Sequence, residues 1–409
     1  MKRFFALILA LVIALSLFAC GSKDDGEPAN FEHTDTTTVA VGAVILARDD
    51  VAEADVYNFV ADIFDNAANL TSSHAKYGEL SLEYGASVTS VPYHPGAAKY
   101  FAEKGFTVAV KDGAGTGASR NLRFVTGGES GTYYAFGGVI ANVLTSKIDN
   151  VEVTAQTSGG SIDNARKLKN KEAEIAFMQN DVLQYAVTGT ESMKDDGAME
   201  NLCAIASLYP EAVQLVATKS SGIKTIADLK GKKVCVGDQG SGSEVNASQI
   251  IAAAGMSYSD FDVQYLSFSE ASTAMQNGTV DAAFATSALP NSAITELANY
   301  TDIVVVPIDG EIADNLIAQY PFYAKTTIGT DVYGVEAAET VAMMAVLTTT
   351  TDLDEEVVYN ITKTLFENQA DLIAGNAHGK EVTLDTALQG VTVDFHPGAV
   401  KYYKEKGIM

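Results

Sequence analysis

The chain has 409 residues, of which 47% are hydrophobic, and its formal net charge is −25 at pH 7. That length allows two or three domains with ample buried core. So acidic a chain lacks the basic face that nucleic-acid binding requires, and an anionic membrane surface repels it. A small anionic ligand stays compatible with this charge, because helix N-termini and hydroxyl groups bind anions locally.

The N-terminus predicts a targeting segment. A basic start at residues 2–3 precedes an apolar run over 4–19, which is shorter than the roughly 20 residues of a spanning helix. The run ends in Leu-Phe-Ala-Cys-Gly at 17–21, the form of a bacterial lipoprotein cleavage site. A plain signal peptide with an incidental cysteine is the alternative. We favour lipidation of Cys20, because residues 21–37 have the polar composition of a tether.

The next feature is an internal repeat. Residues 50–106 match residues 352–408 without a gap, and both copies contain His-Pro-Gly-Ala-x-Lys-Tyr. Two copies so far apart do not form a solenoid. We interpret 38–106 as a partial duplicate of the C-terminal end of a complete unit, 121–409. The duplicate is expected to form helices that dock beside, or compete for, the surface that 340–408 covers; a poorly ordered relic and a swap between neighbouring chains are the alternatives.

From residue 121 onward strands and helices alternate, which predicts a parallel α/β sheet. Strands are expected near 122–125, 151–155, 173–178, 202–208, 213–218, 234–237, 261–266, 280–285 and 303–307. Helices are expected near 133–144, 162–169, 181–185, 244–254, 269–277, 311–319, 336–349 and 353–374.

Five loops share one design, in which a small or polar turn follows a strand. They are 126–132, 157–161, 179–181, 238–243 and 286–291. The carboxyl ends of parallel strands are where α/β folds bind ligands. We expect the first three loops on one sheet and the last two on another, facing each other across a closing cleft. Each loop alone is more often structural than functional.

Catalytic and metal-binding interpretations have little support. The unit 121–409 has only two histidines, His378 and His396, far in sequence from the loops. His396 and its counterpart His94 are expected to cap or pack helices. Cys203 and Cys235 lie in apolar runs, where a disulfide and two buried thiols are both compatible with export. We therefore expect that the protein is not an enzyme and that it uses no metal ion and no cofactor.

Several motifs together carry a family resemblance. In chain order they are Thr-Gly-Gly-x-x-Gly-x-Tyr-Tyr at 126–134, Ser-Gly-Gly-Ser at 158–161, Gln-Asn-Asp at 179–181, Leu-Tyr-Pro-Glu at 208–211, Gly-Ser-Gly-Ser at 240–243 and His-Pro-Gly-Ala-Val-Lys-Tyr-Tyr at 396–403. This series resembles the TAXI family, the extracytoplasmic solute receptors of tripartite ATP-independent periplasmic (TRAP) transporters. The resemblance covers 121–409, whereas 38–106 resembles only the family's C-terminal end.

The resemblance implies an α/β fold of the type II periplasmic-binding-protein class, with two domains, a hinge and a ligand cleft. It implies capture of a small carboxylate-bearing solute, a glutamate-like amino acid or an organic acid, and its delivery to an ion-driven TRAP permease. The protein would be extracytoplasmic, lipid-anchored to the outer face of the bacterial cell membrane or periplasmic. A surface lipoprotein that senses a ligand without transport is the alternative.

The candidate ligand-binding residues lie on the five loops or adjoin them. They are Thr126, Gly127, Gly128, Ser130, Tyr133, Ser158, Ser161, Gln179, Asn180, Tyr209, Ser241, Ser243 and Thr286. No arginine of these loops is placed to clamp a carboxylate, so N–H groups and hydroxyls are expected to hold it. The expected division is a signal peptide 1–20, a linker 21–37, the partial repeat 38–106, a linker 107–120, receptor domain I over 121–208 and 303–409, and receptor domain II over 209–302.

Overall fold

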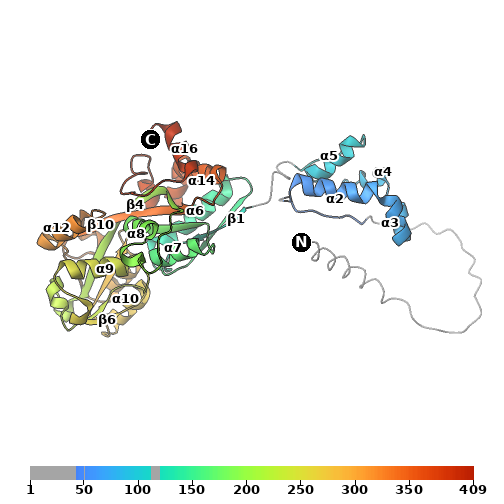
Figure 1. Ribbon diagram of the computed structural model, residues 1–409. Helices are drawn as coiled ribbons and strands as arrows, with labels where there is room; N and C mark the ends of the chain where they lie inside the picture. The colour runs from blue at the N-terminus through green and yellow to red at the C-terminus, as the bar shows by residue number, and fades with distance from the viewer. Residues whose placement is uncertain (1–42, 50, 112–119) are drawn as a thin grey trace, which may run out of the picture. The chain divides into compact units, whose positions relative to one another are not determined.

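The computed structural model describes residues 43–49, 51–111 and 120–409 (Figure 1). The predicted signal peptide and Cys20 lie outside the described residues. A helical part, 51–111, and an α/β part, 120–409, are considered separately. In neither part is a helix both long and apolar enough to cross a membrane.

The α/β part is built on one ten-stranded sheet. Its strands are β1 (Arg120–Val125), β2 (Val151–Gln156), β3 (Ile175–Gln179), β4 (Leu202–Thr218), β5 (Lys233–Cys235), β6 (Asp262–Gln264), β7 (Ala282–Ser287), β8 (Ile303–Val306), β9 (Ala324–Ile328) and β10 (Ala338–Thr350). Its α-helices are α6 (Thr132–Lys147), α7 (Ser161–Lys169), α8 (Asn180–Thr188), α9 (Gly242–Ala253), α10 (Phe268–Gln276), α11 (Ser292–Tyr300), α12 (Gly310–Gln319), α13 (Thr330–Tyr333), α14 (Glu355–Glu367), α15 (Gln369–Gly375) and α16 (Pro397–Lys406).

The strand order is β2-β1-β3-β10-β4-β7-β5-β6, with β8 beside β4 and β9 beside β10. The three strands at each end are parallel to one another, whereas β4 and β10 pair antiparallel to each other and to their neighbours. The prediction of two separate parallel sheets is therefore wrong. Each end is parallel as expected, but the two long strands in the middle join them into one mixed sheet.

The long strands β4 and β10 pass from one half of the sheet to the other (Figure 1). Strand β10 pairs with β9 over 338–342 and with β3 over 345–348. Its pairing with β4 shifts register between Ala345 and Val346, close to Pro210 of β4. Such irregularities bend a strand, and proline lacks the ladder donor. The sheet is thus divided here into two lobes, and the two-lobed α/β architecture that the sequence predicts is confirmed.

Two elements near the lobe junction differ from the sequence prediction. Residues 336–349 were expected as a helix, but 338–350 form β10. The segment is buried along almost its whole length and is rich in valine and threonine, and an apolar run buried on both faces has no period that separates strand from helix. Strands expected at 202–208 and 213–218 are the single strand β4. It runs across the predicted domain boundary at 208/209.

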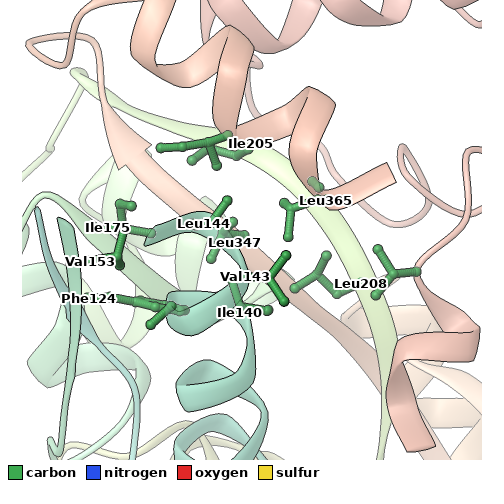
Figure 2. Packing of buried hydrophobic residues seen from close by; sticks show 14 of the residues in the cluster. Phe124, Ile140, Val143, Leu144, Val153, Ile175, Ile205, Leu208, Leu347 and Leu365 are labelled. Atoms are coloured by element: carbon green, nitrogen blue, oxygen red, sulfur yellow. The ribbon is translucent and has the colours of Figure 1, made fainter. Parts of the chain in front are cut away.

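Helices cover both faces of the sheet, and the first lobe illustrates the packing (Figure 2). On one face, Ile140 and Leu144 of α6 lie between the sheet residue Phe124 and Leu365 of α14, and all four side chains are fully buried. Burying a leucine or isoleucine side chain stabilises the fold by about 1.5–3 kcal/mol. Helices α7 and α8 contribute to the cluster on the other face. This packing fixes where α6 begins, at the loop that follows β1.

The helical part has a small core of its own. Its helices are α2 (Glu53–Asp65), α3 (Ala67–Ser73), α4 (Leu82–Gly85) and α5 (Pro95–Glu103). Val56, Ala97, Tyr100 and Phe101 are buried between α2 and α5.

The contacts of this core recur in the α/β part at the matching positions. Tyr57 donates to Glu103 at 2.6 Å, and Tyr359 donates to Glu405 at 2.8 Å. Nδ1 of His94 accepts from the N–H two residues on, at 3.2 Å, and His396 does the same at 3.1 Å. Both histidines therefore cap a helix N-terminus, as the sequence predicts.

Candidate ligand-binding site

A cavity of about 60 Å³ lies between the two lobes, with room for roughly four to six water molecules. All five predicted loops contribute to its wall. It is lined by Gly127, Gly128, Ser130, Gly131, Thr132, Tyr133, Gly159, Gly160, Ser161, Gln179, Glu211, Asp238, Ser241, Gly242, Ser243, Ser267, Phe268, Thr286 and Ser287.

Four helices begin at this cavity. The first residues or N-caps of α6, α7, α9 and α10 are among its lining residues. Each N-terminus carries unpaired N–H groups and the positive end of a helix dipole. Four of them around one small cavity form a site for an anionic group that requires no basic side chain.

Three serine hydroxyls can also donate hydrogen bonds into this cavity. Ser161 Oγ accepts from the N–H of Gln179 at 3.1 Å, Ser241 Oγ from that of Glu244 at 3.1 Å, and Ser243 Oγ from that of Thr286 at 3.0 Å. Because each oxygen accepts a backbone hydrogen bond, its own proton is available to donate. All three serines line the cavity, so they can donate to an oxyanion there.

The two lobes touch each other around the cavity. Ser292 Oγ of the second lobe donates to the carbonyl of Ser130 at 2.9 Å, and the N–H of Asp163 donates to the carbonyl of Gly240 at 3.4 Å. A Cβ on Gly242 would lie 2.1 Å from Oε1 of Gln179 across the junction. The lobes thus contact each other at the cavity, and a larger residue at 242 would have to displace the side-chain amide of Gln179.

A buried polar network also crosses the junction. Asn246 of α9 donates to Asp181 Oδ2 of α8 at 3.3 Å and contacts the hydroxyl of Tyr323 at 3.0 Å. Tyr323 donates to Gln249 Oε1 at 2.6 Å, and Gln249 donates to the hydroxyl of Tyr185 at 3.1 Å. Burial raises the pKa of Asp181 to about 7, although hydrogen bonds to its carboxylate oppose this shift.

The structure brings most of the predicted site residues together. Those that line the cavity are Gly127, Gly128, Ser130, Tyr133, Ser161, Gln179, Ser241, Ser243 and Thr286. They come from the three predicted loops of the first lobe and from the two predicted loops of the second lobe.

Four predicted residues make other contacts instead of lining the cavity. Thr126 donates to the carbonyl of Gln156 at 2.7 Å, and Ser158 Oγ accepts from Gly160 at 3.2 Å. Asn180 holds the carbonyl of residue 390 at 2.9 Å. Tyr209 is fully buried, and its ring stacks on His378 at 5.5 Å. Their positions support the loops and the core beneath the cavity.

Glu211 is the main site residue that sequence reasoning missed. Its side chain is only 2% exposed and lines the cavity, and Tyr133 donates to its Oε2 at 2.7 Å. Burial raises the pKa of Glu211 to about 8, and the hydrogen bond from Tyr133 opposes that rise. The motif Leu-Tyr-Pro-Glu points to this position. However, its proline suggests a turn, so nothing local places the glutamate inside a strand.

Asp238, Ser267 and Phe268 also line the cavity without having been predicted. Asp238 is partly buried, which raises the pKa of its carboxyl group. Ser267 caps α10 in a capping box with Glu270, a Ser-x-x-Glu signal that the sequence displays.

Tyr133 is held in place by its ring as well as its hydroxyl. The ring stacks on Phe177 with centroids 4.7 Å apart and planes 13° apart. Its hydroxyl can therefore reach Glu211 without freedom to turn away. Burial raises the pKa of Tyr133 well above its ordinary value, so the phenol is a hydrogen-bond donor throughout the neutral range.

A second, larger hollow of about 790 Å³ lies elsewhere, where α14 passes the end of α6. Two of its cations are paired with carboxylates: Arg120 with Asp354 at 3.5 Å and Lys147 with Asp371 at 2.9 Å. We therefore place the ligand site in the smaller cavity, where donors converge.

The cysteines and possible metal ligands were also located. Cys203 and Cys235 are buried free thiols, which decides the alternative that the sequence left open. Over the described ranges, no three His, Cys, Asp or Glu side chains are grouped so that they could hold a metal ion.

Comparisons with known proteins give one family match and several weaker ones. A putative aliphatic sulfonates-binding protein of Escherichia coli (strain K12) is 38% identical over 73 residues, which are 18% of this chain and 23% of that protein. The chain thus aligns with about a quarter of that relative's length.

Among solved structures, the alkanesulfonate-binding protein SsuA of Xanthomonas axonopodis pv. citri bound to MOPS is 14% identical, with a TM-score of 0.41, over 69% of this chain and 82% of that one. A putative L-cystine ABC transporter protein of Listeria monocytogenes is 13% identical, with a TM-score of 0.41, over 66% and 98%. The model of the NMT1-like family matches residues 25–105 and 124–407, which is most of the sequence. The chain therefore belongs to the NMT1-like family.

Proposed function

We propose that this protein is an extracytoplasmic solute receptor. It captures a small carboxylate-bearing solute between its lobes and delivers it to an ion-driven TRAP permease. One observation carries the binding role: four helix N-termini and three serine hydroxyls surround one small cavity between the lobes. An oxyanion satisfies these donors together.

The absence of a reacting group in the cavity wall favours binding over catalysis. Among the described residues, the wall contains no His, Cys or Lys, and no hydrogen bond joins the hydroxyl of Ser130 or Ser241 to the carboxylate of Glu211 or Asp238. The serine oxygens accept hydrogen bonds from backbone N–H groups, which makes them donors and not nucleophiles.

Calorimetry and thermal-shift measurements on the full chain test the binding role. The panel contains amino acids, mono- and dicarboxylates and, because of the sulfonate-binding relative, alkanesulfonates. We expect at least one solute to bind and raise the melting temperature. If the whole panel gives neither heat nor stabilisation at millimolar concentration, the receptor function is wrong.

The TRAP assignment rests on the motifs from 126–134 to 396–407 and needs a transport test. Cells that carry the receptor and a neighbouring multi-pass permease should take up the bound solute without ATP hydrolysis. Uptake that requires an ATPase subunit would instead assign the receptor to an ABC transporter, and binding without uptake would favour a sensory lipoprotein.

The lipid anchor on Cys20 is likewise a proposal from sequence. Metabolic labelling with a fatty acid should mark the wild-type protein but not the Cys20→Ser variant. Equal labelling of the two would leave a plain signal peptide as the better interpretation.

We infer further that 38–106 arose as a duplicate of the receptor's C-terminal segment. Matching positions carry the same helix caps and the same Tyr–Glu hydrogen bonds. A Cβ on Gly96 or on Gly398 would lie 2.2 Å from a backbone carbonyl oxygen of the preceding long helix. So specific a close approach favours common descent over chance similarity.

A further inference from the structure

The charged side chains in the cavity wall are all acidic. They are the carboxylates Glu211 and Asp238, and the described lining residues include no Lys, Arg or His. The anion-binding donors are therefore backbone and hydroxyl groups, while the only formal charges are negative. A solute with nothing but negative charge would leave Glu211 unpaired and would be repelled by its ionised form.

Among the described residues, no Lys, Arg or His side chain pairs with Glu211. Its side chain accepts a hydrogen bond from the neutral hydroxyl of Tyr133. The titratable groups that influence it are Tyr133 on α6, Tyr209 on β4 and Asp181 at the start of α8, none of them basic. A buried carboxylate without a counter-ion is costly, so a cation from the solute would be strongly stabilised there.

Two further acceptors at the cavity are unsatisfied. Gln179 Oε1 and Thr286 Oγ1 are buried without a hydrogen-bond partner. Their side chains are 3% and 5% exposed, and both residues line the same small cavity as Glu211. An ammonium group has three N–H donors and no acceptor. It can therefore donate to acceptors of all three side chains, namely a carboxylate, an amide oxygen and a hydroxyl oxygen.

We propose that Glu211 is the specificity-determining counter-ion for an ammonium group on the solute. The receptor then selects a zwitterion, whose anionic end lies at the helix N-termini and whose ammonium group lies at Glu211, Gln179 and Thr286. This inference rests on the proposed receptor function and narrows it from carboxylate-bearing solutes in general to amino acids and their sulfonate analogues.

Matched pairs of solutes test the requirement for an ammonium group. Calorimetry on the full chain compares L-alanine with propionate, L-leucine with 4-methylpentanoate, L-glutamate with glutarate, and taurine with ethanesulfonate. In the pair that binds, we expect the deaminated member to bind at least about 30-fold more weakly, because it leaves Glu211 unpaired. A deaminated member that binds as tightly overturns the inference but leaves the receptor function standing. If no solute binds, both fail.

Two variants assign the effect to the residue. Glu211→Gln should weaken binding of the amino-bearing solute by about 30-fold or more, without weakening the deaminated analogue. Glu244→Gln is the matched control, because this carboxylate is partly buried but lies outside the cavity wall. It should change the ratio within a pair by less than about threefold. If Asp238→Asn abolishes the discrimination and Glu211→Gln does not, Glu211 is not the counter-ion.

Proton release provides a readout on the wild-type protein, so the test does not depend on a variant that folds. Burial raises the pKa of Glu211 to about 8 without solute, so the carboxyl is largely protonated at pH 7. An ammonium group binds the ionised form and expels that proton. Calorimetry at pH 7 in buffers of different ionisation enthalpy should show release of a substantial fraction of a proton. Proton uptake would mean that the solute binds protonated Glu211, and would overturn the proposal.

Discussion

At the scale of residues, the cavity is defined by how backbone and side chains share hydrogen bonds. Serine oxygens accept hydrogen bonds from backbone N–H groups, so their own protons can be donated to a solute. Tyr133 is fixed by stacking on Phe177 and directs its phenol to Glu211. The site is therefore organised before a solute arrives, which lowers the entropic cost of binding.

The phenol of Tyr133 can be tested on its own. Tyr133→Phe keeps the stacked ring but removes a hydrogen bond to a carboxylate, an interaction worth about 1.5–3 kcal/mol. We expect the solute affinity measured by calorimetry to fall about 10- to 100-fold. The melting temperature of the ligand-free protein should also fall, because this hydrogen bond is present without solute. Tyr134→Phe is the control, because that neighbouring ring is 37% exposed. Equal affinities of the two variants would contradict the assigned role.

A second substitution tests closure of the lobes. Gly242→Ala places a methyl group against the amide of Gln179, which belongs to the other lobe. Overpacking of this kind costs about 1–3 kcal/mol, so we expect solute affinity to fall about 5- to 100-fold and small-angle scattering to report a more open molecule. Gly138→Ala, where a Cβ meets nothing within 4 Å, is the control. Unchanged affinity in Gly242→Ala would show that the contact is not needed for the bound state.

At the scale of elements, helices α8 and α9 hold the lobes together through polar groups. Asp181, Asn246, Tyr323, Gln249 and Tyr185 form one buried chain of hydrogen bonds across the junction. Such a network is stable only when its members are satisfied, and opening the lobes breaks it. The network therefore contributes to the balance between open and closed states.

The pH dependence of stability follows from the two buried acids. Their folded-state pKa values are raised, to about 7 for Asp181 and about 8 for Glu211, so the folded protein binds more protons than the unfolded chain above pH 4–5. The free energy of unfolding should thus fall as pH rises from about 5 to 8, by up to about 1.4 kcal/mol per pH unit for each group.

Thermal unfolding of the solute-free protein at several pH values measures this slope. Solute that copurifies is first removed by partial unfolding and dialysis. Asp181→Asn and Glu211→Gln should each flatten the slope, since an amide does not titrate. A melting temperature that rises from pH 5 to pH 8 would contradict the buried-acid explanation.

At the scale of the whole molecule, the receptor is one mixed sheet bent at its two longest strands. Strands β4 and β10 join the lobes, and the register shift near Pro210 marks the bend. Glu211 follows that proline directly, so the position that turns the strand also carries the proposed counter-ion into the cavity. Closure and recognition of the solute are thereby linked in one segment.

Removal of the partial repeat tests whether 120–409 suffices for binding. Every residue that lines the cavity lies between 127 and 287. We therefore expect the variant without residues 38–106 to bind the same solute with an affinity within about threefold of the full chain, as measured by calorimetry. A loss of tenfold or more, with the melting temperature preserved, would assign the repeat a part in binding.

Local sequence determined the elements and the binding edge. A small or polar turn after each strand is a property of neighbouring residues, so the loops 126–132, 157–161, 179–181, 238–243 and 286–291 could be identified without a structure. The histidine caps were also predictable, because His94 and His396 begin the same motif.

Two features were decided by the tertiary structure alone. They are the joining of the strands into one mixed sheet and the burial of Glu211 between the lobes. Residues 338–350 are buried along almost their whole length, and pairing with the distant strands β3 and β4 makes them a strand. Glu211 looks like a turn residue beside Pro210, and only the pairing of β4 with β10, in which Glu211 lies opposite Met343, makes it part of a buried strand. Both results depend on contacts between segments more than 100 residues apart in the chain, which no local pattern encodes.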